Sequence, residues 1–341
     1  GAGAVRRVAR GMDAMARGGP GSADAGAATD AGAAVGAGAR LQRGQHRGTQ
    51  ERRGMNVHIV CEVGGTHVLQ RMARALADET GWSLSTTPDP AADVNYFLPY
   101  LSWQPVGTRT AAYFTHLETG DSGKATKWHA VDVRVDGRIV TASRYLAHLH
   151  GSRAMARPPV DLGKFTPERR RRGPTRTVGV SGMVYTTGRK GEHLVEMLAR
   201  SPLGRRLKIV ASGRGWSVNT ARYPWETMQE FYRGLDVFLC TSLIEGVPMP
   251  PLEALACGVP VVVPVDVGML DDLPDAVGVY RYRAGNYDEM ITALQGALDD
   301  VDRLRQGEEM HLPGFVAQYT ATNWAADHEK AFGAWFARAE R

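Results

Sequence analysis

The stretch that decides the fold runs from Ile244 to Pro264 and reads IEGVPMPPLEALACGVPVVVP. Its prolines pre-set φ for a sharp turn into a short helix, and its closing valines are typical of a parallel strand buried on both faces. Two glutamates, Glu245 in the turn and Glu253 in the predicted helix, stand eight positions apart in this apolar segment. Because a carboxylate binds a vicinal diol well, the pair predicts recognition of a sugar or a ribose. Helix capping plus surface exposure is the alternative explanation.

The same alternation of apolar runs and amphipathic helical stretches continues on both sides of this segment. Strands are predicted at 56–63, 92–100, 109–116 and 137–143, and again at 176–184, 206–213, 235–242 and 259–264. Helices are predicted at 66–80, 190–200, 225–234, 249–258 and 323–340. The pattern predicts an α/β fold of two doubly wound, Rossmann-like domains, with the ligand in the cleft between their strand C-termini.

Composition places the boundaries of these domains. Residues 1–54 are rich in Gly, Ala and Arg and contain no Phe, Trp or Tyr, so we expect a disordered leader. Since Met55 opens the first predicted strand, we also expect this leader to be an upstream extension without function. We assign residues 55–158 to an N-terminal domain, 159–320 to a C-terminal domain and 321–341 to a terminal helix that packs back on the N-terminal domain.

Charge and cysteine content exclude several classes of protein. The net charge of +5 resides in residues 1–54, whereas residues 55–341 hold equal numbers of bases and acids. A nucleic-acid partner is therefore disfavoured, and we read the arginine run 169–172 as a solvated face of the interdomain linker. With no bilayer-length apolar run and no signal peptide, we expect no integral membrane segment. The three cysteines, too few for a disulfide framework, predict buried thiols and a cytoplasmic protein; they are Cys61, Cys240 and Cys257.

The predicted strand 235–242 ends at Ser242, where ligand contacts are expected in a parallel sheet. The loop that follows leads into a helix whose first turn offers unpaired N–H groups, a favourable site for an anion. Glu245 and Glu253 are then placed to face one cleft.

The segment from Tyr232 to Pro264 resembles the donor-site signature of retaining glycosyltransferases of the GT-B fold, in the large family 4 (glycosyl transferases group 1). The matching residues are Ser242, Glu245, Gly246, Glu253, Ala254, Ala256, Gly258, Pro260 and Val261. The resemblance extends more weakly from Pro159 to about Leu298. It implies two Rossmann-like domains, an acceptor side formed by 55–158 and a nucleotide-sugar-binding side formed by 159–320.

The resemblance also implies roles. Glu245 would contact hydroxyls of the donor sugar, and Glu253 the nucleotide ribose. The loop of Gly246, Val247, Pro248 and Met249 would hold sugar or phosphate through backbone N–H groups, of which Pro248 has none. Arg189 and Lys190 would stabilise the leaving diphosphate. Gly213 and Gly215 would let the nucleotide base approach the backbone, although a simple turn explains a lone GxG equally well.

One departure from the family pattern concerns the diphosphate cations. Relatives read Gly-Arg, four residues, then Lys-Gly, whereas this chain has Gly182-Met183 and only later Arg189-Lys190-Gly191. Either Arg189 replaces the displaced arginine, or one phosphate contact is missing.

The first domain contributes fewer candidates. Gly64 and Gly65 follow its first strand, where the family often has a glycine pair near the donor phosphates; a turn with a helix N-terminus at Thr66 is the alternative. His116 ends the strand 109–116, where relatives place a histidine near the donor sugar, or else it is structural. Three aromatic residues are candidates for stacking on an acceptor ring, with core packing as the alternative; they are Tyr100, Trp103 and Trp128.

The resemblance implies a retaining, front-face transfer in which the departing phosphate takes the acceptor proton. We expect metal independence because no Asp-x-Asp triplet appears, and because Asp132 and Asp136 in VDVRVD read as alternation along a strand. No cofactor is expected beyond a nucleotide-sugar co-substrate such as a UDP- or GDP-sugar, and the acceptor is an unidentified glycan, lipid or small molecule. A nucleotide-sugar epimerase or hydrolase, and a non-catalytic nucleotide-sugar-binding protein, are the alternative functions.

Overall fold

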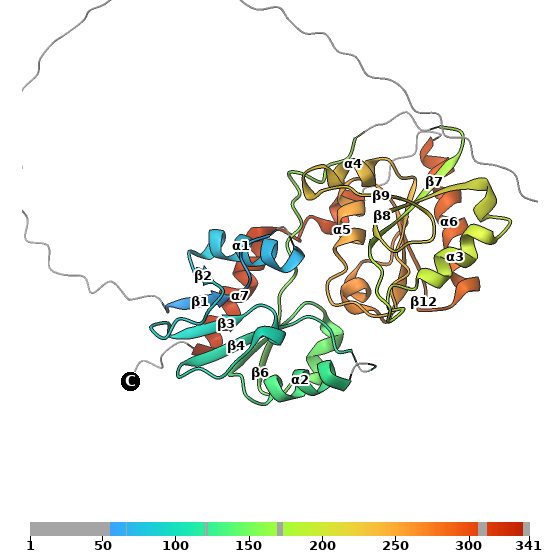
Figure 1. Ribbon diagram of the computed structural model, residues 1–341. Helices are drawn as coiled ribbons and strands as arrows, with labels where there is room; N and C mark the ends of the chain where they lie inside the picture. Colours follow the sequence, from blue (N-terminus) through green and yellow to red (C-terminus); the bar gives the residue numbers. More distant parts are fainter. Residues whose placement is uncertain are drawn as a thin grey trace, which may run out of the picture. The chain divides into compact units, whose positions relative to one another are not determined.

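A computed structural model describes residues 55–65, 67–118, 120, 122–168, 173–305 and 312–336. The predicted leader 1–54 and the arginine run 169–172 lie outside the described residues. In the described part, the chain forms two sheets of six strands each, and every strand pair is parallel (Figure 1). An α/β fold with two doubly wound domains is therefore confirmed.

The first sheet, which defines the N-terminal domain, has the strand order β2-β1-β3-β4-β5-β6. Its central strands are buried along almost their whole length, as expected for parallel strands covered on both faces, although each contains at least one polar residue. Its edge strands are short and partly exposed. The strands are β1 Val57–Val60, β2 Ser83–Ser85, β3 Val94–Phe97, β4 Arg109–Phe114, β5 Gly137–Val140 and β6 Ser152–Met155.

The second sheet, which defines the C-terminal domain, has the order β12-β11-β10-β7-β8-β9. The chain starts in the middle at β7, builds outward to β9, and then returns to the other side of β7 with β10. The strands are β7 Arg176–Met183, β8 Leu207–Arg214, β9 Asn219–Ala221, β10 Val237–Leu239, β11 Val261–Val265 and β12 Val279–Arg283. The order reverses between β7 and β10, and ligands of doubly wound sheets bind at such a switch point.

Helices connect the parallel strands, as crossover connections require. The α-helices are α1 Val68–Thr80, α2 Ser122–Asp132, α3 Glu192–Arg200, α4 Met228–Arg233, α5 Met249–Ala256, α6 Tyr287–Arg305 and α7 Ala321–Phe336. Short 3₁₀ helices lie at Tyr100–Ser102, Ser143–His148, Gly204–Arg206, Trp225–Thr227, Gly268–Asp272 and Leu312–Val316. None of the helices in the described ranges is long and apolar enough to cross a membrane.

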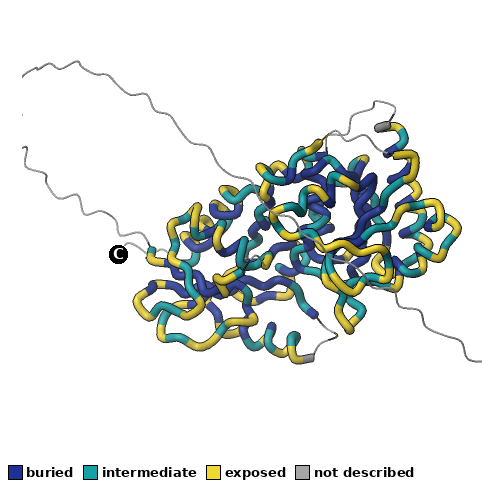
Figure 2. Tube along the Cα trace, turned by 45° about the horizontal axis from the view of Figure 1, so that its top comes forward, coloured by how far each residue is buried: buried dark blue, intermediate teal, exposed yellow. Residues whose placement is uncertain are grey.

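The last helix completes the first domain. Helix α7 follows the C-terminal domain in the chain but packs against α1, β5 and β6 (Figure 1). Its side chains Trp324, Phe332 and Phe336 share one buried cluster with residues of β1, β3 and β4. The approach is close at Gly137 of β5, where a Cβ atom would come within 2.5 Å of the Trp335 ring. The longest buried stretches, dark blue in Figure 2, lie in the interior of the fold, and the central strands of both sheets are fully or mostly buried.

Some local predictions were wrong. The stretch VDVRVD is not a strand, because Asp132 ends helix α2 and is buried beneath Arg138, whose Nε donates to its Oδ1 at 2.8 Å. Asp136 lies in the following turn and accepts a hydrogen bond from the Thr110 N–H. Helix α1 begins at Val68 with His67 as N-cap, not at Thr66.

Core packing explains several aromatic residues and all three thiols. Tyr100 and Trp128 are fully buried and pack on Phe114, whereas Trp103 is partly buried. All three cysteines are buried free thiols, as predicted. Burial raises the pKa of Cys61 and Cys240 to about 11, so neither is a ready nucleophile.

Candidate active site

A cavity of about 530 Å³ lies where residues from both domains meet. The C-terminal end of β4 and the start of α1 form its wall on the N-terminal side. The loops after β7 and β10 and the start of α5 form the opposite wall. The lining residues are His67, Val68, Leu69, Arg71, Thr115, His116, Ser181, Gly182, Met183, Tyr185, Arg189, Lys190, Tyr223, Trp225, Met228, Tyr232, residues 245–250 and Glu253.

Lys190 and Glu245 form the central ion pair of this cavity. They come from the loops after β7 and β10, which flank the switch point. The Ser242 hydroxyl donates a second hydrogen bond to Glu245 Oε1 at 2.9 Å. A carboxylate with an ammonium group beside it can accept hydrogen bonds from sugar hydroxyls while the ammonium group binds an anion.

Backbone contacts fix the two loops together. The Leu243 N–H donates to the Arg189 carbonyl at 2.7 Å, and the Thr241 hydroxyl donates to the Lys190 carbonyl at 2.7 Å. Gly191 has a φ of +61°, and a Cβ atom there would lie 2.0 Å from the Thr241 carbonyl oxygen. Only glycine therefore allows this approach, which brings Lys190 within reach of Glu245.

The same loop is held from the N-terminal domain. The Tyr145 hydroxyl donates to the Glu245 carbonyl at 2.8 Å, and the Thr141 hydroxyl donates to the Gly246 carbonyl at 3.1 Å. A Cβ atom at Gly246 would lie 2.0 Å from the carbonyl oxygen of Thr115, at the end of β4. The cavity is thus closed on this side by direct contact between loops of the two domains.

Glu118, which the sequence analysis did not identify as a site residue, is a buried carboxylate in contact with His116. Its Oε2 lies 3.3 Å from His116 Nε2, 2.6 Å from Lys124 Nζ and 3.6 Å from Arg189 Nη1. Burial opposes ionisation of Glu118, but hydrogen bonds from Lys124 and His116 and the Arg189 charge outweigh it, so its pKa lies below its usual value. Burial lowers the pKa of His116 despite this carboxylate, so the imidazole is neutral near pH 7.

Arg189 faces the cavity with part of its hydrogen-bonding capacity unused. Its guanidinium lies 4.2 Å from the centre of the Tyr185 ring. Its Nε is buried and has no hydrogen-bond partner among the described residues. Such a buried N–H donor next to Lys190 is suited to an anionic ligand oxygen.

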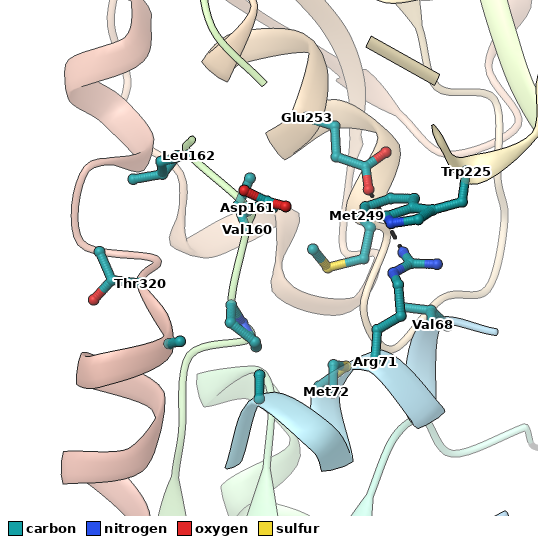
Figure 3. Close-up of a pocket in the computed structure, with 13 residues that line it drawn as sticks. Val68, Arg71, Met72, Val160, Asp161, Leu162, Trp225, Met249, Glu253 and Thr320 are labelled. Carbon is teal, nitrogen blue, oxygen red and sulfur yellow. Dashed lines mark ion pairs between the residues drawn. The ribbon is translucent and has the colours of Figure 1, made fainter. Parts of the chain in front are cut away.

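Glu253 also lines this cavity and is buried, with an exposed fraction of 4%. The Tyr232 hydroxyl donates to its Oε2 at 2.6 Å, and Arg71 Nη2 of helix α1 lies 3.8 Å from its Oε1. Figure 3 shows Arg71 and Glu253 pointing toward each other beside the Trp225 ring. Loss of solvent raises the pKa of Glu253.

A second cavity of about 430 Å³ adjoins the first and shares residues of its wall (Figure 3). Apolar side chains of α1 and the linker dominate its surface, with Asp161 and Thr320 as polar members. Arg71, Trp225 and Glu253 line both cavities, so they form the boundary between them.

Most predicted site residues converge on the larger cavity: Glu245, Gly246, Val247, Pro248, Met249, Glu253, Arg189, Lys190 and His116. In the loop after Glu245, the Met249 N–H already donates a hydrogen bond to the Val247 carbonyl at 2.9 Å. Ser242 reaches the site through Glu245.

Four other predicted glycines, Gly64, Gly65, Gly213 and Gly215, do not line this cavity. Gly213 pairs with Gly182 across β7 and β8, and a Cβ atom there would lie 2.0 Å from the Gly182 carbonyl oxygen. Gly215 packs beside Val184 in the same way. Gly64 and Gly65 precede His67, which does line it. Sheet packing accounts for the glycine at 213.

Sequence reasoning missed Arg71, Tyr185, Trp225 and Glu118 as site residues. Arg71 sits among the polar positions of an ordinary amphipathic helix, so no local signal marks it. The segment 223–225, Tyr-Pro-Trp, was the better clue, because two aromatic residues around a proline next to a predicted helix start are unusual on a surface.

Comparisons with known proteins point to one family. The model for Glycosyl transferases group 1 matches residues 191–300. The curated lipopolysaccharide 1,6-galactosyltransferase of Escherichia coli K12 is 35% identical over 81 residues, which cover 24% of this chain and 21% of that protein. The match thus spans about a fifth of the relative's length.

Solved structures show the same fold along most of the chain. The lipopolysaccharide outer core galactosyltransferase WaaB in its apo form gives a TM-score of 0.59 at 12% identity, covering 82% of this chain and 99% of that one. The Anabaena protein HepE in complex with UDP-glucose gives 0.55 at 12% identity, covering 82% and 95%. The chain therefore shares the two-domain α/β fold of these two proteins. Glu245 and Glu253 both lie in residues 191–300, the segment that is similar to the Glycosyl transferases group 1 model.

Proposed function

We propose that the chain is a glycosyltransferase that moves a sugar from a nucleotide-sugar donor to an acceptor hydroxyl. The observation that carries this proposal is the convergence of Lys190, Glu245 and Glu253 on one cavity at the switch point of the C-terminal sheet. Two of these residues lie in the segment that the family model matches. The neighbouring structure solved with UDP-glucose supports a nucleotide sugar as donor.

The residues divide the donor between them. Lys190 and the unpartnered Nε of Arg189 bind the diphosphate. Glu245, held by Ser242 and by its carbonyl contact with Tyr145, accepts hydrogen bonds from sugar hydroxyls. Glu253 accepts hydrogen bonds from the ribose. All four of these donor-binding residues line the same cavity.

The proposed chemistry is retaining transfer by a front-face route. Negative charge grows on the diphosphate as the glycosidic bond breaks, and preorganised cations stabilise it. The leaving phosphate oxygen takes the proton of the acceptor hydroxyl on the same face of the sugar. His116 is neutral, so it acts as a hydrogen-bond partner of the donor sugar and not as a cation. We also propose that the reaction needs no metal ion and takes place in the cytosol, since the three free thiols suit a reducing compartment.

Incubation with UDP-, GDP- and ADP-sugars tests the proposal. The wild-type chain should release nucleoside diphosphate slowly from one donor class, and this release should persist in EDTA. Lys190→Met should lower turnover by about 100-fold, as removal of a charge-stabilising donor does, and Glu245→Ala should abolish release.

The matched control is Lys208→Met, because Lys208 is exposed on β8; its turnover should stay within about twofold of wild type, as for ordinary surface positions. NMR of the released sugar gives the anomeric configuration, and inversion would refute the front-face route. Failure of every donor to bind or react would refute the proposed function.

A further inference from the structure

Glu253 is a buried carboxylate that has two side-chain partners from other helices. It projects from α5 into a gap bounded by α4 and α1, where both its oxygens have partners: Tyr232 on Oε2 and Arg71 on Oε1. An ionised carboxylate has about four acceptor sites. Two hydroxyl groups can therefore bind while Tyr232 and Arg71 keep their places.

The charge state of Glu253 depends on these neighbours. The groups facing it are Tyr232 of α4, Arg71 of α1 and Lys164 of the linker, with Cys257 at the end of its own helix and Asp161 near Arg71. Burial favours the protonated form, whereas the Tyr232 hydrogen bond and the charges of Arg71 and Lys164 favour the ionised form. Loss of either partner shifts this balance toward protonation.

Arg71 is itself held in place by Trp225. Its guanidinium carbon lies 3.5 Å from the centre of the Trp225 ring, which is stacking distance (Figure 3). Lys164 Nζ lies 4.4 Å from the same ring. Trp225 therefore fixes a cation of the N-terminal domain over a carboxylate of the C-terminal domain.

We propose that Tyr232 and Arg71 are positioning residues, which hold the Glu253 carboxylate oriented so that it recognises both hydroxyls of the nucleotide ribose and rejects 2′-deoxynucleotides. This inference rests on the proposed function, because it takes Glu253 as the ribose-binding group. Tyr232 fixes the plane of the carboxylate from within the C-terminal domain. Arg71 adds a positive charge from the N-terminal domain, so residues of both domains contribute to binding the ribose.

The discrimination has a physical basis. A 2′-deoxynucleotide leaves one oriented carboxylate oxygen without a hydroxyl partner, and a charged hydrogen bond lost in this way weakens binding by roughly 10- to 100-fold. If the carboxylate is free to rotate or becomes protonated, it adapts to either sugar, and the preference shrinks to a few-fold.

Calorimetric binding of UDP and 2′-deoxyUDP, and of GDP and 2′-deoxyGDP, from pH 5 to pH 8 tests the inference. The variants are Tyr232→Phe and Arg71→Gln. The matched control is Tyr280→Phe, since the Tyr280 hydroxyl also donates to a carboxylate, that of Asp300, but in β12 and α6 outside the cavity. The wild-type protein and the control should prefer the ribonucleotide by about 10- to 100-fold near pH 7.

Both variants should lose most of this preference at pH 7, and the pH at which it disappears should rise. The sign follows from Glu253: the preference exists while the carboxylate is ionised and is lost as the pH falls through its pKa, which each variant raises. An unchanged ratio and an unchanged midpoint would overturn the inference, and so would an equal loss of affinity for both sugars.

If Tyr232→Phe unfolds, Arg71→Gln carries the test, because the Arg71 side chain lines the cavities and is partly exposed, whereas Tyr232 is fully buried. Failure of the wild-type protein to bind any of the diphosphates would instead refute the proposed function. The two failures are therefore distinguishable.

Discussion

Replacing Gly246 by alanine places a methyl group against the backbone of the opposite domain. The new Cβ atom would lie 2.0 Å from the Thr115 carbonyl oxygen and 2.5 Å from its carbonyl carbon. Neither atom is the end of a flexible side chain, so the two loops must separate by roughly 1.5 Å to reach ordinary contact distance. The backbone of Gly246 itself does not have a positive φ, so alanine introduces no local strain.

Separation of the two loops would weaken the hydrogen bonds that join them. It pulls the Glu245 and Gly246 carbonyls away from the hydroxyls of Tyr145 and Thr141. Overpacking of this kind costs about 1–3 kcal/mol. A displacement of about 1 Å near reacting groups can cost about 100-fold in rate. Nucleotide affinity should change less, because Lys190 and Glu253 are held by contacts away from Thr115.

Donor turnover and nucleoside diphosphate affinity, measured side by side, give the answer. Gly246→Ala should lower kcat by about 100-fold and leave the diphosphate Kd within about threefold of wild type. The control is Gly107→Ala, where a Cβ atom meets nothing within 4 Å. Turnover within about twofold of wild type, in a folded Gly246→Ala protein, would show that the contact between Gly246 and Thr115 plays no part in catalysis.

Two further predictions follow from buried titratable groups. Glu118→Gln removes the negative charge that contacts His116, Lys124 and Arg189, so the free energy of unfolding should fall by about 2 kcal/mol. Adding Arg189→Gln should restore part of this free energy in a double-mutant cycle. Additive losses in urea unfolding would contradict the pairing of Glu118 with Arg189. Burial lowers the pKa of His328 to about 4, although its hydrogen bond from Nδ1 to the Trp324 carbonyl opposes this shift. The neutral ring accepts a hydrogen bond from the Tyr96 hydroxyl at Nε2. Since the unfolded chain binds this proton near pH 6.5, stability should be complete above that pH and decline as the pH falls toward 4, by about 3 kcal/mol. His328→Gln should flatten the pH dependence of the urea midpoint, and an unchanged slope would contradict this reading.

The sequence predicted the parts of the fold whose burial is continuous. Valine-rich runs such as 261–263 lie in strands buried on both faces, and such runs have few alternative structures. The edge strands β2, β6 and β9 escaped prediction because they are short and partly or wholly exposed, so no hydrophobic period marks them. Helix α2 escaped because its apolar residues do not gather on one face.

The candidate site divides in the same way. Glu245, Lys190 and Glu253 lie in local sequence motifs that indicate ligand binding. Their partners do not: Arg71 meets Glu253 from a helix 182 positions away in the chain, a pairing that only the tertiary fold creates. The glycine at 213 shows the converse, because the close approach of two strands requires it without any ligand.

The return of α7 to the first sheet has a consequence for the timing of folding. Strand β1 is synthesised early, yet the helix that covers its sheet, Ala321–Phe336, follows about 260 residues later. At roughly 5–20 residues per second, the ribosome needs on the order of 10 to 50 s to deliver it. During that interval Ile59 and Tyr96 lack the cover of Trp324 and Phe332, and before it ends all six strands of the C-terminal sheet have been made. The domain that is begun first is therefore the one that is finished last, and the nascent chain must keep an open apolar sheet face from aggregating until its final helix emerges.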